Sequence, residues 1–291
     1  MTLSILIVNW NTRDLVIKCI NSILRNLPSF DFEIVVVDNA SKDGSADSLT
    51  HLYGHNRRVK IFQSLRNLGF AKGCNLAYFY SQGEYVMLLN PDTEVIDNSL
   101  ERLVNYLEER SEIGVIGPRL LNPDGTLQHS VRRFPGIFSS LVVFSGLHRI
   151  FQPRRYLMAD FDYSREAEVD QVMGAALLTR RKIIERIGFL DEKFWLWYEE
   201  VDFCKRVKDA GYKVVFYPKA QIMHIQGQSF SQMEIYFRKR TVARSLIHYF
   251  RKHGNRMDVI MIELLLPVVL GIAKFLDYLR RFFGVKVKLR T

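Results

Sequence analysis

Polar residues that could bind a cation or a phosphate follow apolar runs at three places in the first hundred residues. The stretch "LLNPDTEV" ends one apolar run, "YVMLL", with an amide, a proline and a carboxylate. The polar residues after the three runs are Asn9 and Asn11, Asp38 and Asn39, and Asn90 and Asp92. Because α/β proteins bind ligands at the carboxyl ends of their strands, we expect these side chains to share one crevice.

Asp92 is a candidate metal ligand, because Mg²⁺ and Mn²⁺ take oxygen ligands and commonly share them with substrate phosphates. A single Asp at a strand end more often caps the next turn, so a metal site needs a second residue. His224, in "IMHIQGQS", could supply an imidazole beside the carboxylate. A lone His after a strand is more often a hydrogen-bonded structural residue, and both interpretations stay open.

The acidic stretch "FWLWYEEVDFCKR" could supply a general base. Glu199, Glu200 and Asp202 open a helix, where acids also complement the helix dipole, and Asp202 can pair with Arg206 four residues later. Apolar surroundings raise the pKa of a carboxyl group, as general-base catalysis requires. The aromatic residues before the acids, which could also stack on a sugar ring, are Trp195, Trp197 and Tyr198.

Strand-like and helix-like segments alternate from the N-terminus. Continuous β-branched runs such as "SILIV" and "EIVVV" are typical of strands covered on both faces. Helical spacing predicts helices over about 71–82 and around 100–107, and the pattern loosens from about 118 to 168 into loops around a short helix. This alternation predicts an α/β protein with three layers, α/β/α, around a mostly parallel sheet.

Composition restricts the class of protein. The 291 residues are 48% hydrophobic and 25% charged, which excludes disordered and fibrous chains. The three cysteines are far apart in the sequence, which argues against a zinc site or a disulfide framework and suits a reducing cytosol. The first residues, "MTLSILIVNWNTRD", are interpreted as a strand and not as a signal peptide.

Positive charge is concentrated in the last part of the chain. Residues 236–291 hold 13 Lys/Arg against 3 Asp/Glu, which equals the net charge of +10 of the whole chain. We therefore divide the chain into a domain of residues 1–235 and a basic, amphipathic helical region of residues 236–291. A nucleic-acid-binding core would itself be basic, so the sequence predicts no nucleic-acid partner.

The C-terminal region contains an apolar stretch from Val259 to Ala273, which Glu263 interrupts. Spanning a bilayer takes about 20 apolar residues. The uninterrupted run, Leu264 to Ala273, is half as long. With basic flanks it favours an in-plane helix or hairpin on an anionic membrane surface. A buried helix, a dimer helix and a true span remain alternatives.

Seven ordered blocks resemble those of inverting glycosyltransferases of family 2, which have the GT-A fold, and especially the bacterial rhamnosyltransferase-like members. The blocks are "SILIVNWN", "VVVDNASKDGS", "NLGFAKGCN", "LLNPDTEV", "VMGAALLTRR", "FWLWYEEVDFCKR" and "HIQGQS", and they span Ser4 to Ser229. The resemblance implies transfer of a sugar from dTDP-L-rhamnose or a UDP-sugar to a glycan or lipid-linked glycan. It also implies a Mg or Mn ion and, with the basic tail, a peripheral enzyme at the cytoplasmic face of the membrane.

The resemblance also assigns roles to individual residues. Glu200 matches the catalytic base, Glu199 could share that role, and Asp92 and His224 match metal ligands. Implied donor-binding residues are Asn9, Asn11, Asp38, Asn39, Asn67, Gly69, Lys72, Asn90 and Asp92, with Asn75 shaping the same loop. Implied acceptor-binding residues are Gly174, Ala175, Trp195, Trp197 and Asp202.

Two positions depart from the family pattern. Asn90 stands at the first position of the DxD motif, so one carboxylate is missing, and Glu200 replaces the commoner Asp at the base position. Two alternatives therefore stay open: a non-catalytic, membrane-associated module of a polysaccharide assembly complex, and a nucleotidyltransferase. The latter would usually have a basic Gly-rich loop after the first strand, where "NWNTRD" stands instead.

Overall fold

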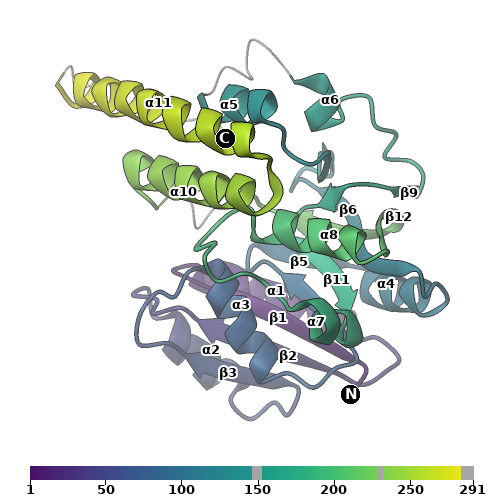
Figure 1. The fold of residues 1–291 in the computed structure, drawn as a ribbon. Coiled ribbons are helices and arrows are strands. Elements are labelled where there is room, and N and C mark those ends of the chain that lie inside the picture. The colour runs from purple at the N-terminus through teal and green to yellow at the C-terminus, as the bar shows by residue number, and fades with distance from the viewer. Residues whose placement is uncertain (146–152, 228–231, 283–291) are drawn as a thin grey trace.

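The computed structural model describes residues 1–145, 153–227 and 232–282 and shows a large sheet covered by helices on both faces (Figure 1). Ten strands form that sheet. Their order is β3 (Val59–Gln63), β2 (Phe32–Asp38), β1 (Leu3–Asn9), β4 (Tyr85–Leu89), β11 (Ala176–Arg180), β6 (Ile113–Leu121), β12 (Lys213–His224) and β5 (Thr93–Ile96), with β7 (Leu127–Gln128) beside β6 and β9 (Ala167–Glu168) beside β12. A separate two-stranded sheet pairs β8 (Val131–Arg132) with β10 (Gln171–Val172).

The helices follow the alternation expected in the first half of the chain. They are α1 (Arg13–Arg25), α2 (Ser45–Tyr53), α3 (Phe70–Phe79), α4 (Ser99–Glu108), α5 (Ile137–Ser145), α6 (Arg154–Leu157), α7 (Arg181–Ile187), α8 (Glu199–Asp209), α10 (Ile235–His253) and α11 (Arg256–Phe282). The predicted helix over 71–82 ends earlier, at Phe79. There Ser81 Oγ donates to Tyr78 O and Gln82 N donates to the buried Glu33 carboxylate, which turns the chain into β4.

The sheet is mixed, so the expectation of a mostly parallel sheet holds only in part. Strands β1 to β4 are parallel, as are β6 and β12, but β11 runs antiparallel to both β4 and β6, and β5 runs antiparallel to β12. A strand buried on both faces is apolar throughout whichever way it runs. The composition of "GAALLTRR" therefore carries no information about its direction.

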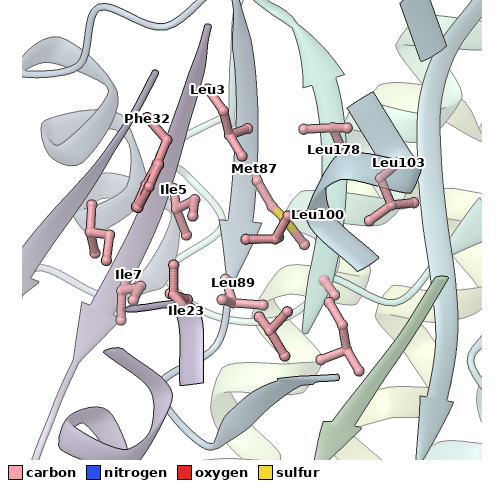
Figure 2. Packing of buried hydrophobic residues seen from close by; sticks show 14 of the residues in the cluster. Leu3, Ile5, Ile7, Ile23, Phe32, Met87, Leu89, Leu100, Leu103 and Leu178 are labelled. Atoms are coloured by element: carbon pink, nitrogen blue, oxygen red, sulfur yellow. The ribbon is translucent and has the colours of Figure 1, made fainter. Parts of the chain in front are cut away.

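Two hydrophobic clusters, one on each face of the sheet, explain why the strand sequences are continuously apolar. Leu3, Ile5 and Ile7 face one cluster, while Leu6 and Val8 alternate into the other. Figure 2 shows Met87, Leu89 and Leu178 of the first cluster beside residues of α1 and α4. Each fully buried aliphatic side chain contributes about 1.5–3 kcal/mol, so this core fixes the strand ends that carry the polar residues.

The C-terminal helices pack on one another and on α5, away from β1 to β3 (Figure 1). A third apolar cluster joins α5, α10 and α11 to the segment before α8, with Phe194, Leu246 and Leu266 fully buried. Helix α11 continues through Pro267. Within residues 1–145, 153–227 and 232–282, no helix has the length and apolarity to cross a bilayer.

Candidate active site

A cavity of about 320 Å³ opens between the ends of β1, β4 and β12 on one side and the start of α8 on the other. Twelve of the residues singled out in the sequence line it. They are Asn39, Asn67, Gly69, Asn90, Asp92, Gly174, Ala175, Trp195, Trp197, Glu199, Glu200 and His224. Segments separated by up to 185 positions thus meet at one crevice, as the strand-end argument predicted.

Four predicted donor-binding residues lie outside the cavity lining. Asn9 and Asp38 are fully buried, and Asn9 Nδ2 donates to Asp38 Oδ1 at 2.8 Å, so the pair joins the ends of β1 and β2. Asn11 Oδ1 accepts from Lys42 N at 2.6 Å beside a separate shallow depression. Lys72 Nζ lies 3.6 Å from Glu192 Oε2 in an ion pair whose two side chains are half exposed.

Asn39 organises the loop that enters α3. Its Oδ1 accepts from Leu68 N at 2.8 Å, and its Nδ2 donates to Asn67 Oδ1 at 3.0 Å. Gly69 follows with φ +84, and a Cβ there would lie 2.4 Å from Trp195 O. Only glycine fits this approach, which lets Phe70 N donate to Trp195 O at 2.7 Å and fixes one side of the cavity to the other.

Asp92 and His224 come together because β5 and β12 pair in the register Thr93 to His224. Asp92 Oδ1 lies 3.4 Å from His224 Nε2, and both side chains are buried. Gln128 Nε2 donates to His224 O and to Asn122 Oδ1, which leaves Gln128 Oε1 to accept from His224 Nδ1 at 2.7 Å. His224 Nε2 then presents its lone pair to a carboxylate, and a cation between them would make that contact favourable.

Glu199 and Glu200 begin α8 at the opposite wall. One oxygen of each, Oε2, is buried and has no hydrogen-bond partner among the residues that the structure describes. Burial raises the pKa of Glu199 well above its ordinary value, and the neighbouring Glu200 charge adds to this. Burial also raises the pKa of Glu200, although backbone N–H groups and Arg132 oppose it. Carboxyl groups whose pKa values are raised above the ordinary range are suited to proton transfer at neutral pH.

The segment before α8 holds two consecutive non-glycine residues in the left-handed region, Trp197 with φ +65 and Tyr198 with φ +72. Such backbone costs of order 1–3 kcal/mol per residue and persists where packing enforces it. Ser245 Oγ of α10 donates to Leu196 O at 2.8 Å, and the ring of Phe237 contacts that of Trp195. Helix α10 therefore holds the aromatic segment of the cavity wall in place.

Asp202, predicted as an acceptor-binding residue, lies away from the cavity lining and is fully buried. Its carboxylate contacts Arg206 at 2.8 Å, Lys252 at 2.8 Å and His253 at 2.7 Å. Burial alone would raise the pKa of Asp202, but hydrogen bonds from His253 and Lys252 outweigh it and lower the pKa. The residue thus joins α8 to α10, and the geometry gives it no route to a ligand in this cavity.

The cavity also has lining residues that the sequence argument missed, of which Arg132 is the most significant chemically. It belongs to "RRFPG", in the region interpreted as loops, and the two-residue strand β8 is too short to show a periodicity. The others with polar or aromatic side chains are Trp10, Phe70 and Gln226. In the seventh sequence block, Gln228 and Ser229 lie outside the described residues.

Comparison with known proteins identifies the family. A family profile described as "Glycosyl transferase family 2" matches residues 4–188. An uncharacterized protein of Sinorhizobium fredii is 28% identical over 243 residues, 82% of this chain, and the match spans 26% of that protein. An N-acetylglucosaminyl-diphospho-decaprenol L-rhamnosyltransferase of Mycobacterium tuberculosis is 26% identical over 214 residues, 67% of each chain.

A solved structure has the same fold. The mannosyltransferase PcManGT of Pyrobaculum calidifontis, in complex with GDP-Man and Mn²⁺, superposes with a TM-score of 0.59 at 15% identity. The match covers 98% of this chain and 76% of that one. The α/β fold is therefore GT-A-like, with the mixed central sheet described above.

Proposed function

The chain belongs to glycosyl transferase family 2, and from this premise we propose that it is an inverting enzyme acting on a glycan or lipid-linked glycan. The donor is a nucleotide-diphosphate sugar, with dTDP-L-rhamnose first and a UDP-sugar second. The observation that carries the proposal is the pair of glutamates, the buried Glu199 and the partly buried Glu200, at the cavity that Asp92 and His224 line from the other side; each has a buried oxygen without a partner among the described residues.

Glu200 acts as the general base, with Glu199 able to share the role. It takes the proton of the acceptor hydroxyl while that oxygen attacks the anomeric carbon, and the bond to the nucleoside diphosphate breaks on the opposite face. Gly174 supports this position, because a Cβ there would lie 3.3 Å from Glu200 Cβ and would crowd the base. Displacement with one base and no covalent nucleophile inverts the anomeric configuration.

Asp92 and His224 are the residues that would hold a Mg or Mn ion. Their facing acceptor atoms, 3.4 Å apart, and the hydrogen bond that fixes the His224 ring are features of a cation site. Among residues 1–145, 153–227 and 232–282, no cluster of three or more metal-ligating side chains occurs, so donor phosphates and water would complete the shell. When bound, the ion stabilises negative charge on the diphosphate.

The acceptor and the choice of rhamnose rest on relatives. The mycobacterial relative is named for transfer of L-rhamnose to a diphospho-decaprenol-linked sugar. We extend that chemistry to this chain, with a lipid-linked acceptor presented at the cytoplasmic face of a membrane.

A surface of α11 supports peripheral attachment to that membrane. Ile262 and Leu266 face the protein, while the opposite side carries large exposed apolar residues along much of its length. This apolar stripe consists of Met257, Ile260, Met261, Leu264, Val268, Phe275 and Tyr278. Exposed Arg256 and Lys274 lie on the same helix, as expected of a helix lying on anionic lipid.

Vesicle flotation tests the attachment. We expect wild-type protein to float with anionic vesicles, and Leu264→Glu with Val268→Glu to abolish this. Leu52→Glu, at a site 53% exposed on α2, is the control that should float normally. If the wild-type protein does not bind vesicles but forms a dimer that the two substitutions disrupt, the stripe is a homodimer surface instead.

Donor binding tests the enzymatic proposal directly. Thermal shifts are measured with dTDP-rhamnose, UDP-glucose, UDP-GlcNAc and GDP-mannose, each with Mn²⁺ and with EDTA. A ligand that binds the native state raises its apparent stability, so one donor should give a shift that EDTA and Asp92→Asn both remove. No shift with any donor would contradict the proposed reaction.

A further inference from the structure

Arg132 is a charged residue in the cavity wall whose role the proposed reaction leaves undefined. It lies in β8, which pairs with β10 so that Arg132 is opposite Gln171, and Met173 N donates to Ser130 O at 2.9 Å beside this pairing. The short sheet leads directly into Gly174, which contacts Glu200. The backbone around the guanidinium is therefore fixed on the Glu200 side of the cavity.

Arg132 is partly buried, and no described residue forms a hydrogen bond or ion pair with its guanidinium. The neighbouring Arg133 is different, because it is 55% exposed and lies 3.8 Å from Asp170 Oδ1. Neither Glu199 nor Glu200 forms an ion pair with Arg132, although the Arg132 charge opposes the rise in the pKa of Glu200. A partly buried, unpaired cation in a ligand cavity indicates an anionic group on the ligand.

We propose that Arg132 binds a phosphate group of the acceptor, so that the enzyme selects acceptors whose sugar is attached to a phosphate or diphosphate. This inference rests on the proposed function. A guanidinium presents parallel N–H donors that match two phosphate oxygens, and it stays charged at any physiological pH. Binding there places the sugar attached to the phosphate next to Glu200.

The position of Arg132 favours the acceptor over the donor as the source of the phosphate. Arg132 lies in the short sheet of β8 and β10, which leads into Gly174 beside Glu200, and its charge opposes the rise in the pKa of Glu200. Arg132 is therefore on the side of the cavity that holds the base. Asp92, which immediately precedes β5, and His224 of β12 are the candidate diphosphate end of the donor site and lie at the other wall.

Equilibrium binding to wild type, Arg132→Gln and Arg133→Gln tests the inference without requiring turnover. The ligands are farnesyl-diphosphate-linked N-acetylglucosamine, farnesyl diphosphate, inorganic pyrophosphate and octyl N-acetylglucosaminide. Saturating nucleoside diphosphate with Mn²⁺ is present to occupy the donor site. We expect Arg132→Gln to weaken the first ligand about 10- to 100-fold, the range for a charge-assisted hydrogen-bonded contact. The phosphate-free glycoside should be unaffected, and Arg133→Gln should behave as wild type.

The comparison of ligands separates the outcomes. Binding of farnesyl diphosphate but not pyrophosphate would assign the recognised group to a lipid phosphate, and binding of both would assign it to phosphate alone; either supports the inference. Equal loss for phosphorylated and phosphate-free ligands, or no preference for phosphate in wild type, would overturn it. Weaker donor binding in Arg132→Gln would reassign the residue to the leaving diphosphate. If wild type binds no nucleotide sugar, the proposed function fails instead.

Discussion

The two walls of the cavity differ in how their polar groups are satisfied. On the wall formed by the ends of β1, β2 and β4, Asn39 and Asn67 bond to each other and to neighbouring backbone. On the wall formed by α8 and β8, Glu199 Oε2, Glu200 Oε2 and the Arg132 guanidinium have no hydrogen-bond partner among the described residues. A buried polar group without a partner costs about 1–3 kcal/mol. The first wall is thus built for shape, and the second retains groups for a ligand.

The largest effect is expected on the unsatisfied wall, in Glu200→Gln. Removing a general base lowers turnover by about 10²- to 10⁴-fold, whereas the shape of the donor side is unchanged. Steady-state transfer rates and donor binding by thermal shift are measured together. Near-normal turnover in Glu200→Gln, with loss in Glu199→Gln, would identify Glu199 as the base.

Substitution of Asp202 tests whether its ion pairs with Arg206, Lys252 and His253 stabilise the fold and take no part in ligand binding. Asp202→Ala leaves Arg206 and Lys252 without their buried counter-ion, and breaking such a pair costs about 3–5 kcal/mol. Urea unfolding should show this loss. Asp209→Ala, which removes the more exposed Lys205 pair on the same helix, should change the unfolding free energy by less than about 1 kcal/mol. Full stability with lost acceptor binding in Asp202→Ala would restore its predicted role in acceptor binding.

Gly69→Ala tests the close contact of Gly69 with Trp195, which joins the two walls of the cavity. The substitution imposes φ +84 on alanine and a contact of 2.4 Å with Trp195 O. Gly125 is a matched control, since its φ is +80 but no atom lies within 4 Å of its added Cβ. We expect Gly125→Ala to lose about 1–2 kcal/mol of unfolding free energy, from left-handed backbone alone, and Gly69→Ala to lose more. Equal losses would show that the Trp195 contact relaxes freely.

The smallest effect is a gain in stability from Glu199→Gln. The pKa of Glu199 is raised in the folded state, so the stabilisation it gives is complete below its ordinary pKa of 4.5 and is lost as pH rises through the folded pKa. Glutamine removes that loss. The variant should therefore have a higher Tm than wild type at pH 7 and an equal one near pH 4. A lower Tm at pH 7 would mean that the carboxylate is paired.

The wall formed by the ends of β1, β2 and β4, where the polar groups have partners, was easier to predict from sequence than the wall formed by α8 and β8. Asn39, Asn90 and Asp92 each follow an apolar run, and the rule that strand ends share a crevice placed them correctly. Which of them face the ligand was not predictable, because Asn9 and Asp38 have the same pattern yet bond to each other below the cavity. The side-chain type is written in the sequence, but its partner depends on packing.

The wall formed by α8 and β8 depends on contacts between residues that are far apart in the sequence. Arg132 was missed because β8 is defined by its pairing with β10, about forty residues later. The antiparallel direction of β11 has the same cause. Glu199 and Glu200 were singled out from the acidic stretch, and the family resemblance assigned the base role to Glu200. The engagement of Asp202 by Lys252 and His253, in contrast, appears only when α10 is in place.

The attachment of α10 to α8 has a practical consequence for building hybrid enzymes. The family profile ends at residue 188 and the charge boundary lies near residue 236, and either would be a natural junction for exchanging acceptor specificity between relatives. A graft with its junction near residue 236 would separate Asp202 from Lys252 and His253 and remove Ser245 from Leu196 O, whereas a junction at residue 188 keeps these pairs in one unit. A functional chimera has to take α8 and α10 from the same parent.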